Sequence, residues 1–477
     1  MRALVTLLLL DVLTESWFGA LWGTGRLALA KNVLYLALLV ATIVRVGLGR
    51  TWRAFTAPAD VAILVLIGLL AASAVSGQVA PVVAGQGGYL YLRGAIVFYA
   101  LRALTVDQRW IRWLIGICLG WACLNCVLAI AQVAFGRALY TALGWRDLEM
   151  ADIHRAQGLY GHPNDLGHLL GLTIIGVLAW VSVRGQKRPL WLVLGLAALL
   201  LAGLAATSSR ESMFAASGGI MVVAVLARIR WRRVAAVVAI VAVSAAAPML
   251  ALPGNRTEVM RRATGLGISL GIPLPPPPAD LSQPICGPPP PVHTERGSAC
   301  RNALPDQEIR VVYARQGVPL WRARPVLGYG PGTFGGIVAL QTDPSWNRNP
   351  RFAPGGFDLH GFAGKTVDSF WLHLVIELGT AGLLAYLAWL WLLCGPLRRT
   401  RADPIVLFGP AAVIFVVITG VFSLSPEGPF VPVLLFGALG LAWQRSVPPV
   451  GADRPPIPRP RAAVGLDRTA WKSDAVT

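Results

Sequence analysis

The sequence RVVYARQGVPLWRARPVLGYGPGTFGG at 310–336, followed at 365–387 by KTVDSFWLHLVIELGTAGLLAYL, joins an arginine-rich polar segment to an apolar segment of membrane length. The apolar segment begins with Asp368 and carries Glu377 inside it, about 15 Å further along by helical rise. Ionisable groups inside a membrane are costly, and each one is therefore a functional hypothesis. The stretch predicts a membrane protein with a functional site where this segment meets the bilayer.

The composition of the whole chain agrees with this prediction. The 477 residues are 55% hydrophobic and only 14% charged, with a mean hydropathy of +0.61, whereas soluble proteins carry about 25% charged residues. Repeated apolar runs of about 20 residues predict an all-α polytopic membrane protein, because helices satisfy their own backbone in lipid. The net charge of +19 is scattered over the loops, so nucleic-acid binding is excluded.

The apolar runs predict twelve transmembrane helices. They cover 3–20, 28–48, 60–77, 88–104, 109–134, 165–184, 189–206, 211–229, 232–251, 367–394, 404–424 and 430–446. Arginine and lysine concentrate in alternate connections, which the positive-inside rule assigns to the cytoplasm together with both termini. The first run resembles a signal peptide, but Asp11 and Glu15 interrupt it, so we expect a retained span.

This topology divides the chain into four parts. Residues 1–251 hold helices one to nine, 252–366 form a large extracytoplasmic loop before helix ten, 367–446 hold the last three helices, and 447–477 form a disordered cytoplasmic tail. PLPPPP and GPPPP predict irregular backbone over 270–300, with short helices around 304–323. Cys286 and Cys300 lie in this loop, where an oxidising compartment favours a disulfide between them.

The first group of candidate residues lies in HRAQGLYGHPNDLGHLLGL, residues 154–172, just before the sixth predicted span. Arg155 and Asn164 are candidate substrate ligands. The alternative is structural, since Asn164 or Asp165 could cap the helix that follows. We expect no metal site, because the three histidines of this stretch have no acidic partner at a ligand spacing.

The second group is TSSRES at 207–212, a hairpin tip that the topology places outside. A guanidinium between serine hydroxyls suits a phosphate, because arginine donates two parallel hydrogen bonds. The alternatives for Arg210 are pairing with Glu211 or an interaction with lipid headgroups.

The third group is the opening stretch itself, with Arg310, Arg322 and Arg324 on the loop side. The loop holds 12 basic and 7 acidic residues, a balance that suits an anionic substrate. The alternatives are again structural. Arg310 could pair with Glu308, GYGPG could be a tight turn, Asp368 and Ser369 could cap the tenth helix, and Glu377 could be neutral or paired inside the bundle.

Taken in order, these three groups resemble the O-antigen ligase and polysaccharide polymerase superfamily of bacterial envelopes. The resemblance rests on RAQGLYGHPNDLGHLL, on TSSRES, and on RPVLGYGPGTF followed by VDSFWLHLVIELGTAGLL, together with the long loop before the tenth span. It implies a glycosyltransferase of the inner membrane that moves a glycan from an undecaprenyl-diphosphate carrier to a glycan or lipid acceptor, with no metal and no other cofactor.

Carried over by position, the resemblance assigns Arg210 and Arg310 to the diphosphate. The ligases of the family have His followed by Asn at the start of the tenth span, where this chain has Asp368 and Ser369. Asp368 is therefore the expected base, with His360 as a second candidate, and Arg155, Asn164, Arg322, Arg324 and Glu377 are expected to bind substrate. The departure leaves a polymerase, or a ligase with another acceptor, open.

The expected chemistry fits these residue types. Two arginines can neutralise a diphosphate leaving group, and a shielded carboxylate with a raised pKa can deprotonate an acceptor hydroxyl. The rival class is a transporter or flippase of a lipid-linked or small anion, which typically shows repeated halves with a site at mid-membrane. No internal repeat is visible in this sequence.

Overall fold

The computed structural model describes residues 1–49, 55–104, 106–184, 189–229, 309–352, 355–359, 366–398 and 403–446. In these ranges the chain forms helices and no strand. The long helices are α1 (Arg2–Trp22), α2 (Thr24–Leu48), α3 (Pro58–Ser76), α4 (Pro81–Ala103), α5 (Gln108–Phe135), α8 (Pro163–Arg184), α9 (Leu190–Thr207), α10 (Arg210–Leu226), α15 (Phe370–Leu393), α16 (Pro404–Phe422) and α17 (Phe430–Ser446). The shorter ones are α6 (Arg137–Ala142), α7 (Glu149–Asp152), α13 (Ile309–Ala323) and α14 (Ile337–Thr342).

Seven of the described helices are long and apolar enough to cross a membrane, and α9 and α17 are shorter apolar helices. The prediction of an all-helical multi-pass membrane protein is confirmed. The count of twelve spans stays a prediction. The ninth predicted span, most of the loop with Cys286 and Cys300, and His360 lie outside the described residues.

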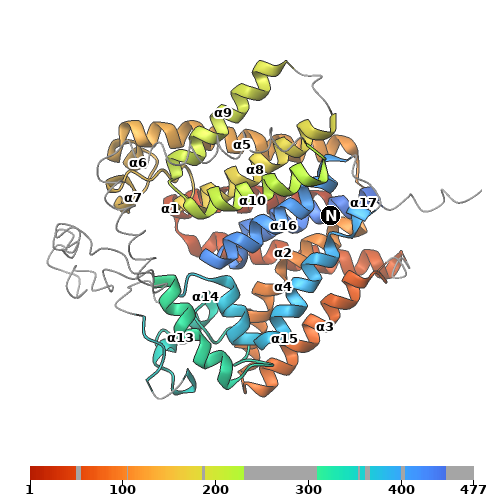
Figure 1. Ribbon diagram of the computed structural model, residues 1–477, viewed down its shortest axis with the longest axis vertical. Helices are drawn as coiled ribbons and strands as arrows, with labels where there is room; N and C mark the ends of the chain where they lie inside the picture. The colour runs from red at the N-terminus through yellow and green to blue at the C-terminus, as the bar shows by residue number, and fades with distance from the viewer. Residues whose placement is uncertain are drawn as a thin grey trace, which may run out of the picture.

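The long helices from α1 to α10 run in alternate directions, as do α15, α16 and α17, so their connections gather at two ends of the bundle (Figure 1). At one end, Arg102 pairs with Asp60 and the Trp443 indole donates to Leu393 O at 2.7 Å. At the other end, the amide of Ala156 donates to Ala206 O at 2.9 Å. Helices α6, α7, α13 and α14 lie at this second end, which we call the loop end (Figure 1).

Small residues let the central helices approach one another closely. Helix α10 packs on α16 and α8, and α4 packs on α17. A methyl group added at Gly171 of α8 would lie 2.5 Å from the Phe415 ring of α16. Gly94 of α4 faces Phe436 of α17 in the same way. Close contact through small residues is the usual way in which helices associate in lipid, where van der Waals packing rather than hydrophobic burial drives the association.

The described part of the segment between α10 and α15 has a hydrophobic core of its own. Phe334 is fully buried at its centre, with the rings of Trp346, Phe352 and Phe357 at 5.1–5.5 Å and near-perpendicular angles. Such edge-to-face aromatic pairs stabilise beyond their buried area. Ile376 of α15 belongs to the same cluster, so the first turns of α15 pack against the loop segment as well as against the bundle.

Helix α15 is broken at Gly379, and the GYGPG loop fills the break. Gly379 has φ 67°, and a side chain there would overlap Val326 O. The amides of Tyr329 and Gly330 donate to Ile376 O and Glu377 O at 3.0 and 2.9 Å, and the Thr380 amide donates to Pro325 O at 2.8 Å. The loop thus satisfies backbone groups that the break removes from the helix, as non-helical backbone at a membrane requires.

Helix α3 adds a further contact at the break. The Ser73 hydroxyl, in the last turn of α3, donates to Glu377 O at 2.8 Å. The depth of Glu377 in the membrane stays a prediction.

Candidate functional site

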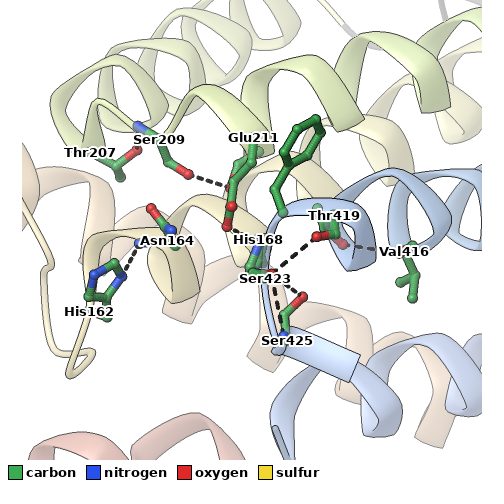
Figure 2. Close-up of polar contacts among 12 residues, drawn as sticks. His162, Asn164, His168, Thr207, Ser209, Glu211, Val416, Thr419, Ser423 and Ser425 are labelled. Atoms are coloured by element: carbon green, nitrogen blue, oxygen red, sulfur yellow. Dashed lines mark hydrogen bonds and ion pairs between the residues drawn. The ribbon is translucent and has the colours of Figure 1, made fainter. Parts of the chain in front are cut away.

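Arg155 connects the start of α8 to the end of α9 at the loop end. Its Nη2 donates to Asn164 Oδ1 at 2.9 Å, and its Nε donates to Thr207 O at 3.2 Å. The backbone amide of Asn164 donates to His162 Nδ1 at 3.1 Å (Figure 2). The imidazole of His162, and not the side chain of Asn164, therefore accepts from the first turn of α8. Arg155 and Asn164, both predicted from sequence, are brought into direct contact.

The tip between α9 and α10 is a tight turn that brings Arg210 to the start of α10. Ser208 adopts φ 50°, the Ser209 amide donates to Thr207 Oγ at 3.1 Å, and the Ser209 and Ser212 hydroxyls lie 2.8 Å apart. Arg210 is exposed at the surface. Glu211, the next residue, points inward and contacts His168 Nε2 of α8 at 3.1 Å (Figure 2).

The third side of the site is made by α13, the end of α16 and the start of α15. Arg310 Nε donates to Phe422 O, the last carbonyl of α16, at 3.0 Å. Next to it, the Ser423 hydroxyl contacts Thr419 O and Ser425 Oγ at 3.2 and 3.0 Å (Figure 2). The Phe370 amide donates to Ser423 O at 3.2 Å, which fixes the start of α15 beside the end of α16.

Asp368 lies where these elements meet. Ser369, and not Asp368, caps α15, since its hydroxyl accepts from the Leu372 amide at 3.4 Å. The Asp368 side chain reaches the surface, but the protein around it raises its pKa by desolvation. The Arg310 guanidinium opposes this shift and Glu211 of α10 adds to it. Residues more than 50 positions apart in sequence therefore act on one carboxyl.

Tyr313, one turn after Arg310, joins α13 to the segment that leads into α15. Burial, together with the nearby carboxylates of Asp368 and Asp358, raises the pKa of Tyr313 to about 12. Its hydroxyl donates to Leu359 O at 3.1 Å. The first turns of α13 are thus packed against the segment that leads into α15.

The backbone adds positive potential to the same place. Helices α8, α10 and α15 all begin at this end of the bundle (Figure 1). The first amides of a helix point outward without helical partners and attract anions. Together with Arg155, Arg210 and Arg310, these three helix starts place positive potential at the loop end, while the backbone amides of Asn164 and Phe370 are already bonded to His162 Nδ1 and Ser423 O.

Arg322 and Arg324 lie elsewhere. They are exposed near the far end of α13, about 18–21 Å along the helix from Arg310. The Arg324 guanidinium lies 4.9 Å from the centre of the Tyr329 ring, a cation–π contact within the loop. Their role as substrate ligands stays a prediction.

Glu377 holds the GYGPG loop. Its carboxylate accepts from the Tyr91 hydroxyl at 2.8 Å and from the amides of Gly332 and Phe334 at 2.7 and 2.8 Å. The side chain is buried, so the expectation of a paired Glu377 agrees with these contacts. They describe an anchor for the loop, and binding of substrate by Glu377 stays a prediction.

Sequence reasoning missed two buried histidine–carboxylate pairs. One is His168 with Glu211, and the other is His373 of α15 with Glu427 in the connection between α16 and α17. The available signal was an ionisable residue inside an otherwise apolar stretch, but the partners are 43 and 54 positions apart. In the part of the chain that the structure describes, no cluster of three or more His, Cys, Asp or Glu could hold a metal ion.

Comparison with known families finds a match over part of the chain. Residues 194–387 match the family model of the O-antigen ligase. This match supports assignment of the chain to the O-antigen ligase superfamily. The matched range runs from α9 into α15 and contains Arg210, Arg310 and Asp368, while Arg155 and Asn164 precede it. A search among curated proteins found no match. The match indicates an envelope glycan function with glycosyltransferase-like activity in a membrane.

Proposed function

We propose that this member of the O-antigen ligase superfamily transfers a glycan from an undecaprenyl-diphosphate carrier to an acceptor hydroxyl, as a polymerase or a ligase. The reaction would take place at the loop end, on the outer face of the bacterial inner membrane. The observation that carries the proposal is that Arg310 of α13 and Glu211 of α10, the residue after Arg210, both act on the Asp368 carboxyl.

In this proposal Arg210 and Arg310 bind the diphosphate. The leaving group gains charge as its bond to the sugar breaks, and guanidinium groups at fixed positions stabilise that charge in the transition state. Arg310 is held by Phe422 O, and Arg155 holds Asn164 and the end of α9 in place. The helix starts beside them add backbone amides.

Asp368 is proposed as the base. It takes the proton of the acceptor hydroxyl while the hydroxyl oxygen forms a bond to the anomeric carbon. The bond from that carbon to the diphosphate oxygen breaks on the opposite face, and the undecaprenyl diphosphate leaves, so the product is inverted. The raised pKa of Asp368 favours this role, since a base works best when its pKa is near the operating pH.

The position of the site supports transfer over transport. A transporter of the same substrate would be expected to carry its binding groups near mid-membrane. Here the predicted arginines and Asp368 gather at one end of the bundle, beside the described loop segment. This arrangement suits a reaction between a lipid-linked donor and an acceptor that approaches from the aqueous side.

The test is purified protein in liposomes with a lipid-diphosphate-linked glycan, and both free carrier diphosphate and elongated or transferred glycan are measured. We expect Arg310→Lys to lower turnover about 100-fold, the usual cost of losing one oriented donor. Arg351→Lys, at an exposed position of the same loop segment, should retain wild-type turnover. Movement of intact donor across the bilayer without release of carrier diphosphate would instead identify a flippase.

A further inference from the structure

The pair formed by His373 and Glu427 is buried and has no part in the proposed chemistry. His373 Nδ1 and Glu427 Oε1 are 2.7 Å apart, with exposed fractions of 0% and 3% for the two residues. Glu427 ends a short 3-10 turn, Ser425–Glu427, between α16 and α17. Burying such a pair costs desolvation, which suggests a role beyond stability.

The pair packs against two consecutive glycines of the loop segment, Gly335 and Gly336. A methyl group added at Gly336 would lie 2.9 Å from Glu427 Oε2 and 3.1 Å from His373 Nδ1. A methyl group at Gly335 would lie 2.7 Å from His373 Nε2. The imidazole also meets the Phe334 ring edge to face, with centroids 5.9 Å apart. The backbone at 335–336 therefore lies directly against the pair.

Gly335 in turn holds the residue before Asp368. Its carbonyl accepts from the Val367 amide at 3.0 Å, and the Val367 side chain is fully buried. The amides of Ser369 and Phe370 donate to Val367 O and Ser423 O at 2.8 and 3.2 Å. The route from Glu427 to His373, Gly335 and Val367 thus ends next to Asp368, and each step is a direct contact.

We propose that the Glu427–His373 pair positions Asp368 by holding the Gly335 backbone that binds Val367. The two residues are positioning residues and do not touch the substrate. The placement of Asp368 follows from the contacts alone, whereas its effect on catalysis rests on the proposed function. The connection between α16 and α17, about 60 residues after Asp368 in sequence, would then determine the geometry of the base.

A series at Glu427 separates the hydrogen bond from the charge. Glu427→Gln keeps an acceptor oxygen at the same reach and removes the charge. Glu427→Asp keeps the charge but shortens the side chain by one methylene, and Glu427→Met removes the acceptor. If holding His373 matters, the effects increase in the order Gln, Asp, Met. If the buried charge matters, Gln is worse than Asp. Should the Met variant fail to fold, the order of Gln and Asp still decides between these alternatives.

The first measurement is amide hydrogen exchange of the peptide that covers 366–370, read by mass spectrometry on the full-length protein in detergent. We expect exchange at least 10-fold faster in Glu427→Asp and near the wild-type rate in Glu427→Gln. Asp60→Asn is the control for general destabilisation, because it removes the buried ion pair with Arg102 at the opposite end of the bundle. The inference is overturned if exchange of this peptide is unchanged in both Glu427→Asp and Glu427→Met. It is also overturned if exchange is accelerated equally in Asp60→Asn.

The second measurement is glycan transfer by the same variants. We expect kcat to fall 10- to 100-fold in Glu427→Asp, the scale of a displacement near 1 Å at a reacting group, with KM for the donor within about twofold of wild type. Loss of transfer without faster exchange at 366–370 also overturns the inference. Faster exchange with wild-type transfer leaves the positioning intact and removes Asp368 from the proposed chemistry, so the two failures are distinguishable.

Discussion

Arg310 donates from its Nε to the carbonyl of Phe422 at 3.0 Å, and this bond joins the first turn of α13 to the end of α16. The final carbonyls of a helix lack helical partners, so a guanidinium stabilises the end of α16 both as a donor and as a positive charge. The same bond places a positive group beside Asp368. One contact therefore serves the helix end and the candidate site together.

For Arg210 we expect the change to lysine to lower turnover about 100-fold although the charge is kept. A lysine ammonium is a point charge and cannot make the paired contacts of guanidinium with a diphosphate. Arg228→Lys is the matched control, since Arg228 is exposed just beyond the opposite end of the same helix. Wild-type turnover in Arg210→Lys would reduce Arg210 to an anchor for lipid headgroups.

Asp368→Asn should abolish transfer and leave the protein folded, because asparagine has nearly the same size but accepts no proton. Loss of a cap cannot explain such a result, since Ser369 caps α15. Transfer by the wild type should rise with pH through the pKa of Asp368, which lies above the ordinary value of 3.8. Polymer formation by Asp368→Asn at the wild-type level would move the assignment to His360, to be tested with His360→Gln.

The raised pKa of Asp368 also predicts how the stability of the folded protein depends on pH. Since desolvation raises the pKa of Asp368 in the folded state, the protonated form is favoured on folding. Stability contributed at this position is present below pH 3.8 and is lost as the pH rises through the raised pKa. Thermal unfolding of Asp368→Asn, compared with the wild type between pH 4 and 8, should lack this component. Parallel curves for the two proteins would contradict the shift.

Tyr91→Phe should lower the free energy of unfolding by about 1 kcal/mol, because it removes one of three donors to the Glu377 carboxylate. Glu377→Gln should cost about 1–3 kcal/mol, because the amide nitrogen cannot accept from a buried donor. Thermal or denaturant unfolding in detergent measures both, with Tyr89→Phe, at a less buried hydroxyl, as the control. A Glu377→Gln protein of wild-type stability without activity would favour substrate binding by Glu377.

Fusions to reporter enzymes test which end of the bundle faces outside. Alkaline phosphatase joined after residue 150, in α7, or after residue 300 should be active, because phosphatase folds only outside the cytoplasm. Cytoplasmic reporters should work after residues 186 and 400, in the arginine-rich connections. An inactive phosphatase at 150 would invert the topology and place the site inside.

The apolar runs predicted most helices within a few residues, because the membrane imposes their length. The run at 28–48 became α2 from Thr24 to Leu48, and the run at 404–424 became α16. The prediction for α4 began seven residues late, at 88, because Gly85, Gln86, Gly87 and Gly88 interrupt its apolar character. These residues are helical since Gly87 packs directly against the Gly332 backbone, a partner far away in sequence.

The candidate site was predictable as a set of residues but not as a set of contacts. The types and order of Arg155, Asn164, Arg210 and Arg310 pointed to an anion. Which of them touch depends on packing between distant segments, as in the bond from Arg155 to Thr207 O over 52 positions. The same holds for the break in α15, where a glycine in an apolar helix gave no sign of the loop that fills it.

The GYGPG loop that fills the break in α15 limits which parts of this protein can be deleted or exchanged with those of relatives. A chain that lacks residues 309–366 would leave the carbonyl of Ile376 without the amide of Tyr329, and the Glu377 carboxylate without the amides of Gly332 and Phe334. An unsatisfied carbonyl exposed to lipid costs several kcal/mol, so the remaining helices are not expected to form a stable membrane protein alone. Specificity would therefore have to be transplanted between relatives together with α15, as one inseparable piece.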